Sequence, residues 1–373
     1  MEREMNPKII TFYLPQFHRV PENDKWWWEG FTDWDTAKKA GALFPGHDQP
    51  RIPLHENYYD LLDKSAMKWQ AELAKKAGIY GFCMYHYWFG EKQLLEKPAE
   101  NLLRWNDIDI NYCFSWANVS WIRSWSKFTG NAWIASPKGG DSGDSGMLVE
   151  QKYGDKEEWK RHFLYLLPFF KDKRYIKRNN KPVFIIYHPS AVDCMRSMVD
   201  CWDQMAMEHG FSGIYFIGTN CEEWKKYRLN GALQYEPIYT RFQEKRFNSL
   251  IDLQIRKIRE ACASKNILFP ELLSYRKTWK FITRRVWNSN VYPGGFVDFD
   301  TSPRKGKGSV IYYGVSPERF YKYLKKLYCR CQKNEVEYLF LTAWNEWGEG
   351  AYLEPDSRYG TKYLNVIRKV THQ

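Results

Sequence analysis

No run of apolar residues in this sequence is long enough to cross a membrane. A spanning helix needs about 18 consecutive, mostly apolar residues, and no stretch of the 373 residues reaches that length. The first residues carry acidic side chains and are not followed by the apolar run of a signal peptide. The sequence therefore predicts a soluble protein without a transmembrane segment, and we expect a cytoplasmic location.

Cysteine patterns that hold metals or disulfide frameworks are also missing. The eight cysteines are scattered, and only Cys329 and Cys331 lie close together, so there is no Cys-x-x-Cys pair and no regular disulfide spacing. No Gly-x-Gly-x-x-Gly follows an apolar run, which removes the phosphate-binding signature of a Rossmann-type open sheet, the runner-up fold. We expect no cofactor and no essential metal.

Aromatic residues and positive charge are both in excess. Trp, Tyr and Phe make 18% of the chain, which is more than a core needs, so some should line a groove where flat rings stack on sugars or bases. The net charge is +12, and residues 241–291 hold twelve Lys/Arg against four Asp/Glu. This segment is either a solvated basic face or a contact with an anionic partner such as a membrane surface. No nucleic-acid motif accompanies it, so no nucleic-acid partner is expected.

Eight short apolar runs, each typical of a strand in a buried parallel sheet, alternate with helical segments along the chain. The runs are residues 8–14, 81–85, 110–115, 182–187, 213–218, 232–236, 296–300 and 339–341. Such an alternation over ~250 or more residues predicts an α/β fold, a (β/α)8 TIM-type barrel. Residues 1–373 then form a single catalytic domain, with a long basic excursion at 238–294 between the sixth and seventh strands.

The eighth run continues into a loop that carries two acids. Glu346 and Glu349 are three residues apart, and Gly348 between them permits a tight turn. Paired carboxylates in an aromatic, partly dry pocket have their pKa values pushed apart, which supplies the acid and the base that sugar chemistry uses. We predict that Glu346 and Glu349 are catalytic. A solvated loop with two unconnected acids is the alternative.

Polar and aromatic residues also follow the other strand runs, where a barrel places its functional groups. The residues predicted to bind substrate are Tyr13, Gln16, His18, Trp28, Trp34, His86, Tyr87, Trp88, Trp116, Asn118, Glu236, Asp300, Trp344 and Asn345. The histidines that end strand runs match no zinc spacing, so we interpret them as polar pocket residues. Trp69 and Trp159 lie on helix faces that we expect to pack in the core.

Asp298 and Asp300 form an Asp-x-Asp element. Many nucleotide-sugar transferases use such a pair to hold a divalent ion, although the pattern alone is a weak signal. Alternation along a strand would place both carboxylates on one face. This element is the main sequence feature that favours a transferase.

Five motifs in the chain resemble those of the WbsX family of bacterial surface-polysaccharide gene clusters. They are Tyr13-Leu-Pro-Gln-Phe-His18, Trp28-Glu-Gly-Phe-Thr-Asp-Trp34, Gly81-Phe-Cys-Met-Tyr-His-Tyr-Trp88, Trp116-Ala-Asn118 and Ala343-Trp-Asn-Glu-Trp-Gly-Glu-Gly350 with Leu353-Glu-Pro-Asp356. Family members are often labelled glycosyltransferases. The closing motif, however, is similar to that of glycoside hydrolase family 99, retaining endo-acting α-mannosidases with a (β/α)8 barrel.

The resemblance implies a retaining reaction with an unusual first step. Glu346 would take the proton of the sugar 2-hydroxyl, whose oxygen attacks the anomeric carbon, while Glu349 protonates the leaving oxygen. The family motif usually reads Trp-Ala-Asn-Glu, whereas this chain has Val119 after Asn118. That difference leaves the substrate preference open.

The sequence thus favours a glycoside hydrolase that cleaves a poly- or oligosaccharide, with carbohydrate as the partner. The resemblance implies endo-action on α-mannoside-type linkages. A glycosyltransferase of O-antigen or capsular polysaccharide biosynthesis, within lipopolysaccharide assembly, is the first alternative. A barrel that binds carbohydrate without catalysis is the second.

Overall fold

The computed structural model describes residues 6–122, 146–243, 267–288 and 290–372, with a few positions between 254 and 265. Part of the basic excursion predicted at 238–294, chiefly residues 244–253, therefore lies outside the described residues, and its membrane contact stays a prediction. The described parts of the excursion include α7 (Ile238–Gln243), β11 (Glu271–Ser274) and α9 (Tyr275–Ile282). In the described part of the chain, no helix has both the length and the apolar character needed to span a membrane.

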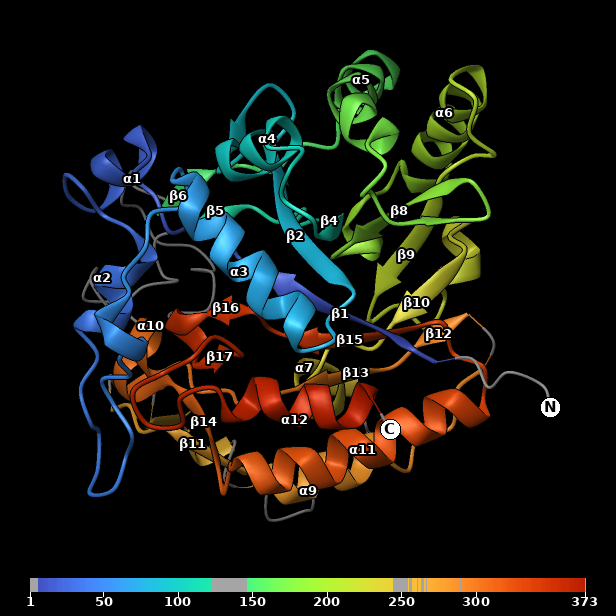
Figure 1. Cartoon of the computed structure of the whole chain (residues 1–373). Helices are drawn as coiled ribbons and strands as arrows, with labels where there is room; N and C mark the ends of the chain where they lie inside the picture. Colours follow the sequence, from blue (N-terminus) through green and yellow to red (C-terminus); the bar gives the residue numbers. More distant parts are fainter. Residues whose placement is uncertain are drawn as a thin grey trace.

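Nine parallel strands form a nearly closed barrel (Figure 1). In sequence order they are β1 (Lys8–Tyr13), β2 (Gly81–Trp88), β4 (Asn111–Trp116), β8 (Lys181–Ile186), β9 (Tyr215–Thr219), β10 (Gly231–Leu233), β12 (Val291–Tyr292), β13 (Gly294–Phe296) and β15 (Tyr338–Thr342). The order around the sheet is β12-β10-β9-β8-β4-β2-β1-β15-β13. Since β12 and β13 flank Pro293 in one segment, the two edges of the sheet belong to a single split strand. The predicted (β/α)8 barrel is confirmed.

The split strand is the seventh of the barrel, and it lies earlier than predicted. The sequence placed it at residues 296–300, but pairing with β10 and then β15 ends at Phe296. Pro293 has no N–H to donate, and its carbonyl accepts from Phe340 at 3.2 Å. Beyond Phe296 the Asp300 N–H donates to the Glu349 carbonyl (2.7 Å). Asp298 and Asp300 therefore follow the strand and lie beside the predicted catalytic loop.

Amphipathic helices cover the outside of the barrel (Figure 1). They are α3 (Lys64–Lys76), α4 (Lys97–Arg104), α5 (Lys156–Lys171), α6 (Met195–Glu208), α11 (Pro317–Lys333) and α12 (Lys362–Thr371), together with α9. Asp63, Asp155 and Ser316 cap three of their N-termini by accepting backbone N–H bonds. With helices outside and side chains inside, the strands are covered on both faces, and every residue of β2 is buried.

Short elements surround the end of the barrel at which the strands finish. They are α1 (Pro21–Trp26), α2 (Asp33–Lys38), β3 (Gln93–Leu94), β5 (Trp121–Ile122), β6 (Met147–Val149), α10 (Ser302–Lys305), β14 (Val310–Tyr313), β16 (Asn345–Glu346) and β17 (Ala351–Tyr352). At the opposite end, β7 (Lys177–Arg178) pairs antiparallel with the first residues of β8. The turn at Trp347–Glu349 packs against both α2 and α10. Figure 1 shows α2, α10 and β16 gathered on one side of the barrel. Three distant chain segments thus meet around the Glu346–Glu349 loop.

Candidate active site

A cavity of about 410 Å³ opens at this end of the barrel. Its lining comes from the loops after most barrel strands and comprises Leu14, Gln16, Trp27, Phe31, Asp33, Thr36, Tyr85, Tyr87, Ala117, Val119, Trp121, Ile122, Leu148, Tyr187, His188, Tyr235, Arg304, Lys305, Glu346 and Glu349. Both predicted catalytic acids line it. We call it the acid cavity.

Arg304 lies between three carboxylates of the acid cavity. Its Nη1 donates to Glu349 (2.8 Å), and its Nη2 donates to Glu346 (3.1 Å) and Asp33 (3.2 Å). The side chains of Glu346 and Asp33 are 5% and 4% exposed, whereas that of Glu349 is 25% exposed. Burial raises the pKa of Glu346 to about 8; Arg304 opposes this shift, and Glu349 and Asp33 add to it. The two glutamates share one cation but differ in contact with solvent.

Gly348 makes this close approach possible. A Cβ atom at this position would lie 2.6 Å from Arg304 Nε and 2.8 Å from Asp33 Oδ2, closer than non-bonded atoms allow. The start of the loop is held by Asn345, whose Oδ1 accepts from the Leu14 N–H (2.7 Å) and whose Nδ2 donates to the Leu14 carbonyl (3.0 Å). The short loop is thereby tied to the end of β1, which limits how far the two acids can move.

A buried carboxylate supports the loop from below. Glu354 accepts from Trp347 Nε1 (2.7 Å), from the Tyr59 hydroxyl (2.9 Å) and from Gln70 Nε2 (2.7 Å). Gln70 in turn accepts from the Tyr13 hydroxyl (2.7 Å). Burial raises the pKa of Glu354 to about 7, against the pull of these donors. Because Trp347 lies between the two acids in sequence, this network orients them indirectly.

Aromatic side chains form much of the remaining wall of the acid cavity. The hydroxyls of Tyr85 and Tyr235 are 2.9 Å apart, and Tyr187 lies beside both. Trp27 packs against Phe31 on another side of the lining. Rings with polar edges suit a sugar, because they pack on its apolar face and can bond its hydroxyls. The arrangement can therefore hold a sugar ring beside two carboxyl groups.

A comparison with protein families matches residues 9–367 to the model described as Glycosyltransferase WbsX. The chain belongs to the WbsX family. Two curated relatives, both described as WxcX and from two strains of Xanthomonas campestris pv. campestris, are 27% identical over 372 residues, or 97% of this chain. The chain spans about half the length of these relatives, of which 49% is covered.

Solved structures described as a glycoside hydrolase and as a glycoside hydrolase-like protein share the fold of this chain. The GH99 endo-alpha-mannosidase from Bacteroides thetaiotaomicron in complex with BIS-TRIS-propane superposes with a TM-score of 0.56 at 13% identity, over 99% of this chain and 97% of that one. A structure described as a glycoside hydrolase-like protein gives a TM-score of 0.56 at 14% identity, over 100% and 95% of the two chains. At such identities, the likeness shows that this WbsX protein shares their barrel fold.

Four of the predicted site residues of this WbsX chain line the acid cavity: Gln16, Tyr87, Glu346 and Glu349. Val119 also lines it, so the position that departs from the family motif is at the site. Tyr13, Trp344 and Asn345 instead lie in the buried layer below the loop. Trp34 packs there as well, with its ring 5.5 Å from that of Trp347 and its Nε1 donating to the Tyr59 carbonyl (2.8 Å).

Three aromatic residues predicted to bind sugar belong to a buried cluster away from the acid cavity. Trp88 Nε1 donates to Glu158 (2.6 Å), and its ring stacks on His162 at 4.3 Å. His86 lies 2.8 Å from His162, nitrogen to nitrogen, and Trp116 donates to the Trp88 carbonyl (2.9 Å). Their positions differ from the prediction because successive side chains of a strand point to opposite faces. His86 and Trp88 point outward to His162 of α5, whereas Tyr87 between them lines the acid cavity.

The other predicted residues also have structural partners or lie outside the lining. Asn118 exchanges two bonds with the His188 backbone, at 2.7 and 2.8 Å, and so positions a residue that does line the cavity. Glu236 pairs with Arg285 at 2.7 Å. His18 is buried away from the lining, and Trp28 is half-buried with its ring against Phe31. Trp69 and Trp159, the expected core residues, are partly buried and pack against the core.

Asp298 and Asp300 are each engaged by positively charged or polar side chains. Asp298 pairs with Arg51 at 2.8 Å. Asp300 contacts Nε2 of His47 (2.9 Å) and accepts from Nε2 of Gln49 (2.8 Å). Although burial opposes it, these bonds and the nearby Arg51 lower the pKa of Asp300 to about 2. Across the described residues, no group of three or more His, Cys, Asp or Glu side chains has the arrangement of a metal site.

The sequence prediction missed Arg304 and Asp33 as site residues, along with the tyrosines Tyr85, Tyr187 and Tyr235. Each of these follows or ends a strand run or lies in a quoted motif, so position alone could have added them. The ion pair between Asp33 and Arg304 could not be predicted from the sequence, because the two residues are 271 positions apart in the chain. Only the closed barrel brings them together.

Proposed function

We propose that this protein is a glycoside hydrolase, with Glu346 as its base and Glu349 as its acid. The observation that carries the proposal is the pair itself: two carboxyl groups face one cavity, share Arg304, and differ in burial. The pKa of Glu346, raised to about 8, lies close to the range in which a general base works well. The glycoside hydrolase fold of the structural neighbours supports this reaction class.

The proposed reaction begins with proton removal from the sugar 2-hydroxyl by ionised Glu346. A base of raised pKa suits so weak an acid. The 2-oxygen attacks the anomeric carbon and forms an anhydro sugar, while the leaving oxygen departs with the proton of Glu349. Water then attacks the same carbon and gives its proton to Glu349, and Glu346 returns its proton to the 2-oxygen. Two inversions leave the configuration retained.

Arg304 has two effects on these steps. Its positive charge makes the ionised form of Glu346 accessible despite burial, and its two nitrogens fix the distance between the two acids. Asp33 completes the charge balance on the other side of the guanidinium. We propose that this arrangement pre-organises the acid and the base before substrate binds.

We propose an oligosaccharide or polysaccharide with α-mannoside-type linkages as the substrate, because a structural neighbour is described as an endo-alpha-mannosidase. Val119 makes one part of the wall apolar. A sugar that presents a deoxy carbon or an axial C–H toward Val119 would fit there better than one that presents a hydroxyl, since a buried hydroxyl needs a partner.

A glycosyltransferase is the second candidate, favoured by the description of the family model. It would need cationic groups or a metal to hold a nucleotide diphosphate. Asp298 and Asp300, the predicted metal pair, already bind Arg51, His47 and Gln49. A transferase that holds a metal on these two aspartates therefore requires those contacts to break on donor binding, which the hydrolase does not.

The test is a pair of incubations. The protein is mixed with α-linked manno-oligosaccharides and with bacterial surface polysaccharides, and the configuration of any released sugar is followed by NMR. In parallel, it is mixed with a panel of sugar nucleotides and acceptors, with and without EDTA. We expect cleavage with retention, and a loss of roughly two or more orders of magnitude in turnover for folded Glu346→Gln and Glu349→Gln. Transfer from a sugar nucleotide without glycan cleavage would replace the proposal by the transferase.

A further inference from the structure

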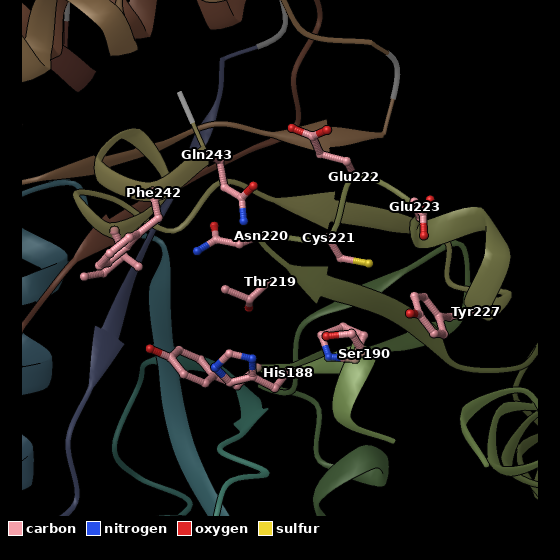
Figure 2. Close-up of a pocket in the computed structure, with 13 residues that line it drawn as sticks. His188, Ser190, Thr219, Asn220, Cys221, Glu222, Glu223, Tyr227, Phe242 and Gln243 are labelled. Atoms are coloured by element: carbon pink, nitrogen blue, oxygen red, sulfur yellow. The ribbon is translucent and has the colours of Figure 1, made fainter. Parts of the chain in front are cut away.

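A second cavity, of about 570 Å³, adjoins the acid cavity. Figure 2 shows its 13 lining residues, which come from the end of β9, from the segments that follow β8 and β9, and from α7, which follows β10. They are Tyr187, His188, Pro189, Ser190, Thr219, Asn220, Cys221, Glu222, Glu223, Tyr227, Ile238, Phe242 and Gln243. Tyr187 and His188 line both cavities. We call this second space the β9 cavity, after the strand whose end lies at its centre.

The lining of the β9 cavity selects against anionic ligands. None of the described residues that line it is Lys or Arg, and Glu222 and Glu223 contribute negative charge. A phosphate or nucleotide diphosphate would therefore meet repulsion with no cation to offset it. The lining instead combines aromatic rings with short polar side chains: in Figure 2 Thr219 and Asn220 lie between Phe242 and Tyr227. Such a mixture suits an uncharged molecule with many hydroxyl groups.

Thr219 gives independent evidence of a ligand. Its side chain is 5% exposed, and its Oγ1 has no hydrogen-bond partner among the described residues. Buried hydroxyls normally have one, because leaving them unpaired lowers stability. Thr219 is the last residue of β9 and lines the β9 cavity. Its Oγ1 is enclosed in this conformation, and a rotation about χ1 would turn the hydroxyl toward a bound molecule that supplies the missing partner.

The backbone links the two cavities as well. Asn220 Oδ1 accepts from the N–H of Tyr235 (2.7 Å), and Tyr235 lines the acid cavity. Asn118 holds the backbone of His188 on the opposite side, and His188 lines both. Side-chain hydrogen bonds therefore hold the backbone of the wall between the two cavities at His188 and at Tyr235. These bonds help to fix the distance between the two cavities.

We infer that the β9 cavity binds a second, uncharged glycosyl unit of the same oligosaccharide whose reacting unit occupies the acid cavity. This inference rests on the proposed function and adds to it the place where the chain continues. Tyr187 and His188 contact both units. The enzyme then prefers oligosaccharides long enough to reach Thr219, and it discriminates against chains that carry an acidic substituent on that unit.

The test compares two isosteric substitutions. Thr219→Val removes the unpaired hydroxyl of the β9 cavity, and Thr11→Val removes an equally buried, unpaired hydroxyl on β1 that lines neither cavity. Each is combined with Glu346→Gln to prevent turnover. The affinity for mannose and for α-linked manno-oligosaccharides of two to about five units is then measured by calorimetry, and the thermal unfolding of each variant is recorded.

We expect Thr219→Val to bind oligosaccharides of two or more units roughly three- to ten-fold more weakly, to bind the monosaccharide unchanged, and to unfold at the same temperature as its parent or higher. Thr11→Val should bind every length as the parent does. Tyr227→Ala, which removes a ring from the β9 cavity, should show the same dependence on length as Thr219→Val.

Equal affinity of the parent and Thr219→Val for every length would overturn the inference, and so would an absence of any increase in affinity with length. A loss of stability in Thr219→Val together with equal losses for short and long chains would show a purely structural role. Failure of the proposed function is seen separately, because it appears as lack of cleavage by the wild-type protein, whereas these measurements record only binding.

Discussion

Replacement of Arg304 by glutamine tests the proposed chemistry most directly. The guanidinium makes three bonds of 2.8, 3.1 and 3.2 Å, and one of its partners is the buried Glu346. An opposite charge at such a distance lowers the pKa of a carboxyl by roughly one to three units. Without it, the pKa of Glu346 should rise from about 8 by a similar amount.

The direction of the resulting change in rate depends on the role of Glu346. A base works only when ionised, so kcat/KM of the wild type should rise with pH through about 8. In Arg304→Gln this rise should move to higher pH, and activity near pH 7 should fall roughly tenfold for each unit of the shift. The assay is the pH dependence of kcat/KM for both proteins on one oligosaccharide.

Arg51→Gln is the matched control. Arg51 is another largely buried arginine that pairs with carboxylates, but these are Asp298 and Asp300, outside the acid cavity. Its contact with the acid loop is a bond to the backbone carbonyl of Gly350 (2.9 Å), not to a glutamate side chain. Each substitution leaves buried carboxylates unpaired and should cost roughly 3–5 kcal/mol of stability, so both are assayed at a temperature where they remain folded. Only Arg304→Gln should move the pH profile. An unmoved profile would refute the reasoning, and activity that falls as pH rises through 8 would show that Glu346 is the acid instead.

Three further predictions concern stability, turnover and binding. The pKa of Glu346 is about 8 in the folded state and exceeds the ~4.3 of an exposed glutamate, so its contribution to stability is present below pH ~4 and is lost as the pH rises to 8. In urea unfolding at about pH 5, 7 and 9, the free energy of unfolding of Glu346→Gln should therefore rise relative to that of the wild type. A difference between the two free energies that stays constant with pH would contradict this. Gly348→Ala should displace Arg304 and lower kcat by roughly an order of magnitude or more, because the catalytic acids are then misplaced. The far-UV circular dichroism should stay unchanged. Wild-type values of kcat and KM would show that the loop adapts. Trp27→Ala should weaken glycan binding by about 1 kcal/mol with little loss of stability, whereas Trp88→Ala should cost about 3–5 kcal/mol of stability; calorimetry and thermal unfolding together distinguish this from the reverse pattern.

The sequence by itself determined the barrel and the acid loop. Both are local properties: apolar runs of strand length alternate with amphipathic segments, and Glu346 and Glu349 follow the last run directly. Pairing between neighbouring parallel strands then leaves one closed arrangement. The seventh strand was misplaced by a few residues because Pro293 splits it, and its neighbours on each side of the proline pair with different strands.

The tertiary structure alone decided which side chains face the acid cavity. Trp88 and Trp27 both lie among aromatic residues in the sequence, yet Trp88 packs against His162 while Trp27 lines the wall. Alternation along β2 turns Trp88 away from the cavity that Tyr87 lines. Trp27 instead follows the short helix α1, where no such alternation applies, so only its tertiary neighbours decide that it lines the wall. Arg304 shows the same limit for charge. Its meeting with Asp33, Glu346 and Glu349 exists only because barrel closure brings segments from both ends of the chain within hydrogen-bond distance, and the pKa of Glu346 depends on that meeting and on burial.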